Sequence, residues 1–82
     1  MFAVYILYSL RYSKTYVGCT SNLIQRFYSH NYLGNKGWTI RYRPWEVIYV
    51  EIFEDKREAL DREQFLKSGL GRRYIKENLL CR

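Results

Sequence analysis

The strongest constraint on the fold is a pair of short apolar segments near the start of the chain. Residues 2–10 read FAVYILYSL and residues 15–19 read TYVGC, with only four polar residues between them. β-branched and aromatic residues favour strands, and two strands joined by so short a loop form an antiparallel hairpin. Because the first segment is apolar at nearly every position, we expect both of its faces to be covered. The core is therefore expected to form on a small sheet.

The remaining segments predict one more strand and three helices. The expected elements are a strand at 45–53 and helices at 23–32, 56–67 and 72–80. Apolar residues occur on both faces of the third strand, which favours a place near the middle of the sheet. The order β-β-α-β-α-α predicts an α+β fold on a small, mostly antiparallel sheet. A length of 82 residues allows one domain, spanning residues 1–82.

Local signals mark the ends of the helices. Residues 20–22 are Thr, Ser and Asn, each able to cap the first helix. Asp55 and Glu58 have the spacing of a capping box at the start of the second. Gly69 and Gly71 are expected to end that helix before the last one begins.

The excess of positive charge lies in the first half of the chain. Residues 1–45 hold six Lys and Arg and no acidic residue, whereas residues 46–82 hold eight of each sign, so the first half carries the net charge of +6. Cations mixed with aromatic rings suit nucleic acid, although a basic surface can also serve solubility alone. Residues 38–44 form a basic, aromatic loop. The expected nucleic acid surface comprises Lys36, Trp38, Arg41 and Arg43. Trp45 belongs either to this surface or to the core.

Several classes of protein are not expected. No apolar run reaches the roughly 18–20 residues that a membrane span needs, and the N-terminus lacks a signal peptide pattern. We therefore predict a cytoplasmic protein with no membrane partner. Two distant cysteines, Cys19 and Cys81, and one histidine do not predict a zinc site. A disulfide between them stays open, beside the simpler interpretation of two reduced thiols.

Glu63 falls within the apolar stripe of the helix at 56–67. At about 100° per residue it shares this stripe with Ala59, Leu66 and Leu70. A carboxylate there is costly unless something pairs with it. One interpretation is a structural ion pair with a lysine or arginine. The other is a Mg²⁺ ion held by this one carboxylate, by water and by a substrate phosphate.

Arg26 and His30 are four residues apart on the first helix and therefore share a face. They lie at the edge of the apolar stripe, where side chains are half-buried and can face a groove. The alternative is a solvated helix edge without a functional role.

Tyr5 and Tyr16 lie on the two strands of the hairpin. A loop of two or four residues would place Ser9 opposite Tyr16 and both tyrosines on one face. Gly18 would leave that face bare, with room for a ligand to approach the backbone. Alternatively, both tyrosines are core residues with a hydrated hydroxyl.

Taken in order, these motifs resemble the GIY-YIG endonuclease superfamily. Residues 3–5 take the GIY position and residues 16–18 the YIG position. The similarity continues through residues 20–23, Arg26, His30, residues 43–45 and residues 58–67. It covers nearly the whole chain and is closest to short, stand-alone bacterial members.

The resemblance implies a three-stranded antiparallel sheet flanked by helices. It implies one Mg²⁺ or Mn²⁺ ion on Glu63, with Tyr5 and Tyr16 facing the scissile phosphate and Arg26 nearby. His30 matches a position that often holds His or Tyr. Two departures are mild, Ala3 for the first glycine and Val17 for isoleucine. For the late asparagine of many members, Asn78 is the candidate, at a longer spacing than usual.

The predicted function is therefore a divalent-metal-dependent endonuclease that hydrolyses DNA phosphodiester bonds, in repair or recombination. So small a domain has little surface for reading sequence, which favours selectivity for a DNA structure. Tyr5, Tyr16 and His30 each qualify as the general base, and RNA stays open as a substrate. The alternatives are a nucleic acid-binding module without turnover and an adaptor within a repair complex, with a protein partner still to be identified.

Overall fold

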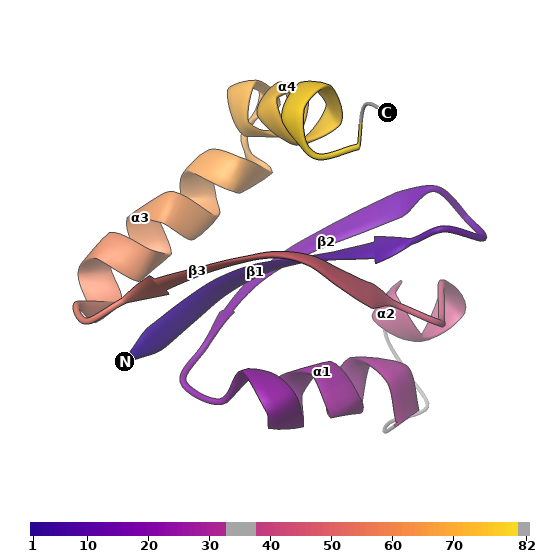
Figure 1. Ribbon diagram of the computed structural model, residues 1–82, viewed down its shortest axis with the longest axis horizontal. Coiled ribbons are helices and arrows are strands. Elements are labelled where there is room, and N and C mark those ends of the chain that lie inside the picture. Colours follow the sequence, from indigo (N-terminus) through magenta and orange to yellow (C-terminus); the bar gives the residue numbers. More distant parts are fainter. Residues whose placement is uncertain (33–37, 81–82) are drawn as a thin grey trace.

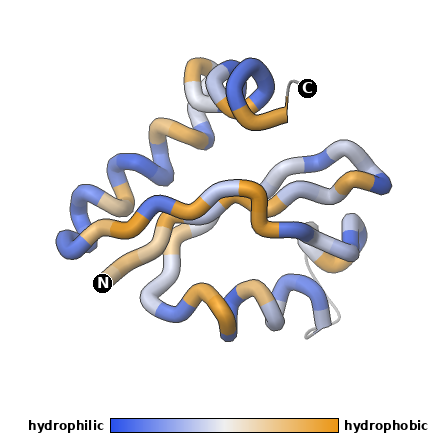
Figure 2. Tube along the Cα trace, in the orientation of Figure 1, coloured by the Kyte–Doolittle hydropathy of each residue, from blue (hydrophilic) through white to orange (hydrophobic). Residues whose placement is uncertain are grey.

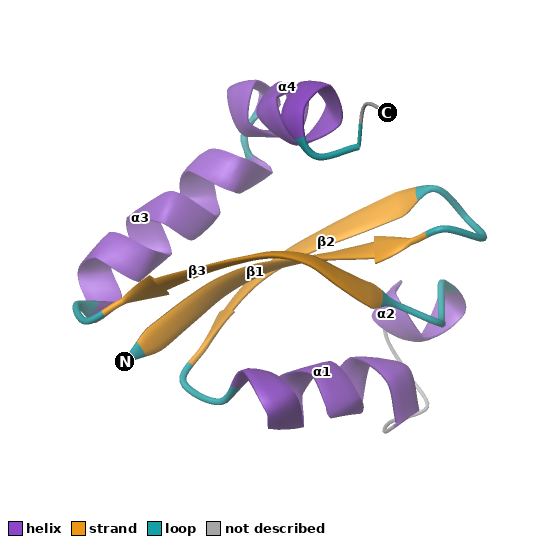
Figure 3. Ribbon diagram, viewed as in Figure 1, coloured by secondary structure: helices purple, strands orange, loops and turns teal. Residues whose placement is uncertain are grey.

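A computed structural model describes residues 1–32 and 38–80 of the chain, excluding the side chain of Trp38. The elements are β1 (Phe2–Ser9), β2 (Lys14–Thr20), α1 (Leu23–Tyr32), α2 (Trp38–Arg41), β3 (Glu46–Phe53), α3 (Lys56–Lys67) and α4 (Gly69–Asn78). The α+β class and the order of the predicted elements are confirmed (Figures 1 and 3). The short helix α2 lies within the segment that we predicted to be a loop. Within the described residues, no helix has the length and apolar character needed to cross a membrane.

The three strands form one antiparallel sheet in the order β2-β1-β3. The first strand is central, and its residues 3–7 are all buried, as its apolar sequence predicts. The predicted place of β3 near the middle of the sheet is wrong, since β3 is an edge strand. Its apolar residues are not all covered: Val50 is 39% exposed and Ile52 is 56% exposed. The apolar residues on both faces of β3 therefore do not indicate a central position in the sheet.

A four-residue loop, residues 10–13, joins β1 to β2. Tyr5 pairs with Gly18 and Leu7 with Tyr16, so the two tyrosines lie on the same face, as predicted. The expected pairing of Ser9 with Tyr16 is wrong, because β2 starts at Lys14 and that residue pairs with Ser9. The register differs by two residues, which leaves the face of every side chain unchanged.

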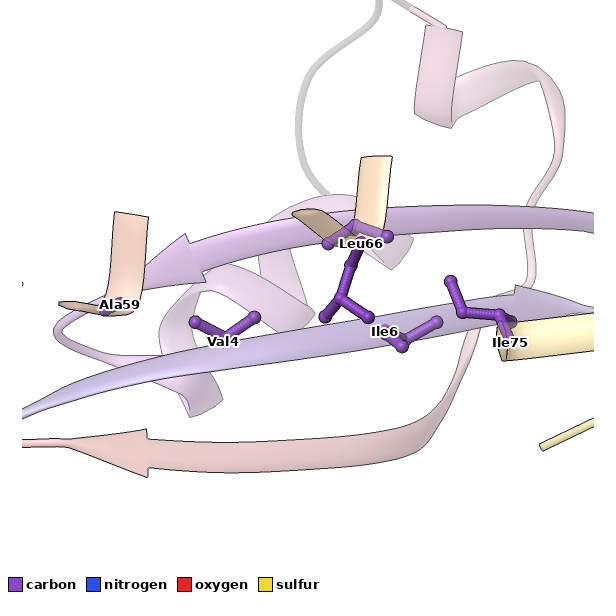
Figure 4. Close-up of a cluster of buried hydrophobic side chains, with 6 residues drawn as sticks. Val4, Ile6, Ala59, Leu66 and Ile75 are labelled. Carbon is purple, nitrogen blue, oxygen red and sulfur yellow. The ribbon is translucent and has the colours of Figure 1, made fainter. Parts of the chain in front are cut away.

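Each face of the sheet has its own core. On one face, α3 and α4 cover a buried cluster of Val4, Ile6, Val17, Ala59, Leu66 and Ile75. Figure 4 shows Leu66 and Ile75 reaching from these helices toward β1. On the other face, beside α1 and α2, the buried cluster is Tyr5, Leu7 and Trp45. Figure 2 shows hydrophobic segments along the strands between these two layers of helices. Because β1 alternates between the two clusters, it fixes the position of both layers.

The first two long helices begin at side-chain caps. The side chain of Asn22 accepts a hydrogen bond from the Gln25 amide at 3.1 Å, which selects it from the three predicted caps of α1. Asp55 caps α3 as predicted, accepting from the Arg57 amide at 2.9 Å.

The boundary between α3 and α4 differs from our prediction. The last helix starts at Gly69 instead of residue 72, because Ser68 ends α3 and also caps α4. Its hydroxyl oxygen accepts a hydrogen bond from the Gly71 amide at 3.2 Å. The glycines thus lie in the first turn of α4. Leu70 belongs to this helix and is exposed, so it is not part of the apolar stripe of α3.

Candidate active site

Three aromatic side chains from β1, β2 and α1 meet on the face of the sheet that α1 covers. The hydroxyl of Tyr5 and Nε2 of His30 share a hydrogen bond of 3.0 Å, and both residues are buried. The ring centroid of Tyr16 lies 4.6 Å from that of His30 and 6.3 Å from that of Tyr5. The structure therefore brings together residues that the sequence places on separate elements.

Arg26 lies one turn before His30 on α1, and its side chain reaches the same phenols. Hydrogen bonding and charge interaction with Tyr5 raise the pKa of Arg26, and interaction with Tyr16 acts in the same direction. Although the residue is exposed, its guanidinium is thus directed at the tyrosine pair. Arg26 and His30 therefore do not form a purely solvated helix edge, because both interact with the tyrosines of the sheet.

Gly18 makes room for the ring of Tyr5. A Cβ atom built on Gly18 would overlap the Tyr5 hydroxyl and would lie 2.5 Å from its Cζ atom. We predicted that Gly18 leaves this face bare for a ligand. Instead, the phenol of Tyr5 occupies that space. The glycine is needed because an aromatic side chain crosses the neighbouring strand at close range.

Burial sets the protonation states of the buried pair. It raises the pKa of Tyr5 to about 12, with the charges of Tyr16 and Glu63 acting in the same direction and Arg26 opposing them. Burial also lowers the pKa of His30, and the charges of Arg26 and Arg43 lower it further. At neutral pH, Tyr5 therefore keeps its proton and His30 is uncharged.

Glu63 lies on α3, which packs on the face of the sheet opposite the tyrosine cluster. Its side chain is 18% exposed, and Oε2 lies 3.2 Å from Nζ of Lys67. The negative charge of Glu63 raises the pKa of Tyr5 and, after burial, that of Cys19, so the carboxylate is close to β1 and β2. The predicted ion pair with a basic residue is present, and it joins two residues of one helix.

Among the described residues, no group of three or more His, Cys, Asp and Glu side chains is placed to hold a metal. A divalent cation at this site would rely on Glu63, water and substrate oxygens. Mg²⁺ is often bound in this way, through one or two carboxylates and phosphate oxygens. Glu63, a single half-buried carboxylate, fits that type of site.

The predicted nucleic acid surface is described only in part. Lys36 and the side chain of Trp38 lie outside the described residues. Arg41 is exposed, with its guanidinium carbon 5.9 Å from the ring centroid of Tyr42. Trp45 is a core residue, which resolves its two interpretations.

Arg43 contacts the end of α1. Its Nε donates to the carbonyl of His30 at 2.6 Å and its Nη2 to the carbonyl of Ser29 at 3.1 Å. These bonds satisfy carbonyl groups that a helix leaves without partners at its C-terminus. Arg43 therefore helps to fix the turn that carries His30, and its contact with nucleic acid stays a prediction.

Two residues near the site escaped the sequence analysis. The side chain of Asn31 bonds both backbone groups of Trp45, accepting from its amide at 2.6 Å and donating to its carbonyl at 3.1 Å. Asn31 thereby joins α1 to the start of β3. Lys67 lies four residues after Glu63, a spacing that predicts an ion pair on any helix.

The structure leaves two further predictions untested, the role of Asn78 and the disulfide of Cys19. Asn78 is exposed and donates to the carbonyl of Tyr74 on its own helix at 3.1 Å, so its place in the site stays a prediction. Cys19 is half-buried and its thiol is free, while Cys81 lies outside the described residues, which leaves the disulfide untested.

Comparison with known proteins agrees with this geometry. Residues 1–78 match the GIY-YIG catalytic domain family. A UPF0213 protein of Clostridium perfringens is 39% identical over 64 residues, which cover 78% of this chain and 68% of that protein. One of Limosilactobacillus reuteri is 37% identical over 75 residues, covering 89% and 77%. The UPF0213 protein YazA of Bacillus subtilis is 35% identical over 65 residues, covering 76% and 66%. No solved structure matches significantly. The chain therefore belongs to the GIY-YIG family, a nuclease superfamily, and is similar to the small bacterial UPF0213 proteins.

Proposed function

We propose that this protein is a divalent-metal-dependent endonuclease that hydrolyses phosphodiester bonds in DNA. The observation that carries the proposal is the convergence of two phenols, one guanidinium and one uncharged imidazole, with the half-buried Glu63 on the helix that packs against the other face of the sheet. We further propose a cytoplasmic location and a role in DNA repair or recombination, selective for a DNA structure.

Tyr16 is our choice for the group that receives the proton of the attacking water. It is half-exposed, whereas Tyr5 is only 1% exposed and has a pKa raised to about 12. A general base must reach the water and give up its own proton near neutral pH, and Tyr5 meets neither condition. The guanidinium of Arg26 also interacts with Tyr16, so a positive charge lies beside the proposed base.

Tyr5 and His30 are assigned a positioning role. The Tyr5 hydroxyl shares a hydrogen bond with the uncharged His30 ring, and Arg26 interacts with the same hydroxyl. The Tyr5–His30 bond joins α1 to the sheet and so helps to position Arg26, one turn earlier on the same helix. The remaining donors of Arg26 can then contact two phosphate oxygens.

Glu63 would hold the divalent cation. When bound there, the cation supplies charge neutralisation at a phosphate oxygen and at the leaving 3′ oxygen. Before metal binds, Lys67 neutralises the carboxylate, and it moves away into solvent at little cost because it is 52% exposed.

The same ion pair favours a second candidate function. If Lys67 never yields its place on Glu63, the chain is a nucleic acid-binding module without turnover. The basic first half and exposed Arg41 would then serve binding alone.

The deciding experiment measures cleavage of single-stranded, duplex and branched DNA by the purified protein with Mg²⁺ or Mn²⁺. Glu63→Gln is compared with Glu54→Gln, an exposed residue just before α3 that undergoes the same chemical change. We expect the first variant to lose at least about a hundredfold in rate, since it removes the metal ligand, and to melt no lower than the wild type. The second should match the wild type in both measurements. Salt-sensitive binding without cleavage by the wild type would select the binding module, as would equal activity of the two variants.

A further inference from the structure

A second concave surface lies on the α4 side of the sheet, opposite the tyrosine cluster. It is a cavity of about 740 Å³ between the β1–β2 hairpin and α4, which we call the α4 cavity. Its lining includes Tyr8, Thr15, Arg72, Ile75, Lys76 and Leu80. Figure 1 shows α4 above the hairpin, on the side of the sheet away from α1. The mechanism proposed above uses none of these residues.

A smaller cavity of about 180 Å³ lies next to the α4 cavity. The two cavities share Thr15, Arg72 and Ile75. The smaller one is also lined by Tyr16, the proposed base, and by Lys67, the partner of Glu63. Because they share lining residues, we treat the two cavities as one groove, which extends from Tyr16 to Leu80 near the end of α4. A substrate strand bound at the site can therefore continue directly into this groove.

The charges along the groove suit a polyanion. Arg73 is bound to Glu77 at 3.1 Å, which cancels this pair of charges. In the described part of the chain, no acidic side chain forms an ion pair with Arg72 or Lys76. These two residues are four apart on α4, so their side chains extend from one face of the helix. They provide two exposed cations on the wall of the α4 cavity.

The floor of the α4 cavity is apolar. It is formed by Tyr8, the buried Ile75 and Leu80. A nucleobase can bury its flat face there only after it leaves a base stack, whereas a duplex offers just its phosphates and groove edges. A volume of about 740 Å³ is within the range of small-ligand pockets and admits one nucleotide.

We propose that this groove binds an unpaired segment of the DNA substrate next to the cleaved bond. Arg72 and Lys76 contact its phosphates, and one base enters the α4 cavity. This inference rests on the proposed endonuclease function and adds the substrate class. The preferred DNA carries a single-stranded flank, such as a flap or an overhang, on one side of the scissile phosphate.

Binding is the first test, because it is measured without divalent metal and is independent of turnover. The probes are a fluorescein-labelled flap DNA and a fully paired duplex of the same length. The Arg72→Ala/Lys76→Ala double variant should bind the flap about tenfold more weakly and lose a salt slope of about 1.4, as expected for two phosphate contacts to a single strand. Its affinity for the duplex should be unchanged. Arg57→Ala/Lys56→Ala, on the first turn of α3, is the matched control for charge and should bind both probes like the wild type.

A second test examines the apolar cavity. A single abasic nucleotide is moved along the flap, one position at a time. An abasic nucleotide at one or two positions should weaken binding to the wild type. The double variant should bind all of these flaps more weakly, but the same positions should still matter, because its apolar cavity floor is intact. Uniform binding across all positions would overturn base insertion. Equal losses in the double variant and the control, or wild-type preference for the duplex, would overturn the groove assignment.

Cleavage then separates this inference from the function on which it rests. If the wild type cuts flap and duplex at equal rates, the endonuclease stands and the groove assignment fails. If flap binding depends on Arg72 and Lys76 but no DNA is cut, the endonuclease fails and the groove remains a binding site for single strands.

Discussion

Tyr5 and Gly18 face each other on neighbouring strands, and the phenol of Tyr5 lies where a side chain on Gly18 would lie. Because Gly18 of β2 has no side chain, Tyr5 of the central strand can extend into the site. The pairing links the two halves of the family's motif through packing, before any chemistry takes place.

Gly18→Ala is expected to displace the Tyr5 ring and to break its hydrogen bond to His30. Overpacking of this kind costs about 1–3 kcal/mol in the free energy of unfolding. Gly69→Ala is the control, since a Cβ on Gly69 meets no atom within 4 Å. Urea unfolding of both variants measures the difference. If Gly18→Ala is as stable as the wild type, the Tyr5 ring does not need this space.

Tyr16→Phe and Tyr5→Phe separate the proposed base from the positioning residue. Loss of a general base lowers kcat by about 10²–10⁴. We expect that loss for Tyr16→Phe, with unchanged stability. Tyr5→Phe should instead lower stability by about 1–3 kcal/mol, because it leaves a buried His30 nitrogen without its partner. Single-turnover cleavage and urea unfolding are the two measurements, and a larger kcat loss in Tyr5→Phe would reverse our assignment.

His30 should make folding stability depend on pH. Its pKa is lowered in the folded protein by burial, then by Arg26 and Arg43. Between that lowered value and about 6.5, the unfolded chain binds a proton that the folded protein does not, so stability falls as the pH falls through this window. The contribution is fully present above about pH 6.5. Urea unfolding at several pH values should show a shallower slope there in His30→Gln, and an identical slope would exclude His30 as the source.

Arg43 and Arg41 should behave differently although they are close in the sequence. Arg43→Ala removes two charged hydrogen bonds to α1 carbonyls, each of a kind worth about 1.5–3 kcal/mol, so it should destabilise the protein clearly. Arg41→Ala removes an exposed cation and should change the unfolding free energy by less than about 0.5 kcal/mol. Binding of DNA below the melting temperature should weaken in Arg41→Ala. The opposite pattern would assign the nucleic acid contact to Arg43.

Much of the fold could be predicted because local signals agree with one another. The helix boundaries at Leu23, Tyr32, Lys56 and Lys67 match the sequence pattern, where caps and apolar spacing coincide. The start of α4 could not be predicted as easily, because Ser68 acts as a cap while glycines nearby indicate a break. The place of β3 depended on which strand pairs with β1, a long-range choice that strand composition does not encode.

The candidate site, too, could be predicted only where local sequence patterns decide the structure. The four-residue spacing of Arg26 and His30 was enough to predict that they share a face of α1. The alternation of side chains along paired strands was enough to predict that Tyr5 and Tyr16 lie on the same face of the sheet. The contact of Tyr5 with Gly18 and the bonds of Arg43 to α1 needed three-dimensional positions, since they join residues from separate elements. The groove beside α4 could not be predicted from the sequence for the same reason.

The sheet separates Glu63 from the aromatic cluster, with α3 on one face and α1 on the other. Both helices must pack on the sheet before Glu63 and Arg26 take up these positions. A chain emerging during synthesis, or one that has lost its last two helices, would hold the tyrosines without the acid. Under the proposed endonuclease function, an incomplete copy of this kind would lack the metal ligand.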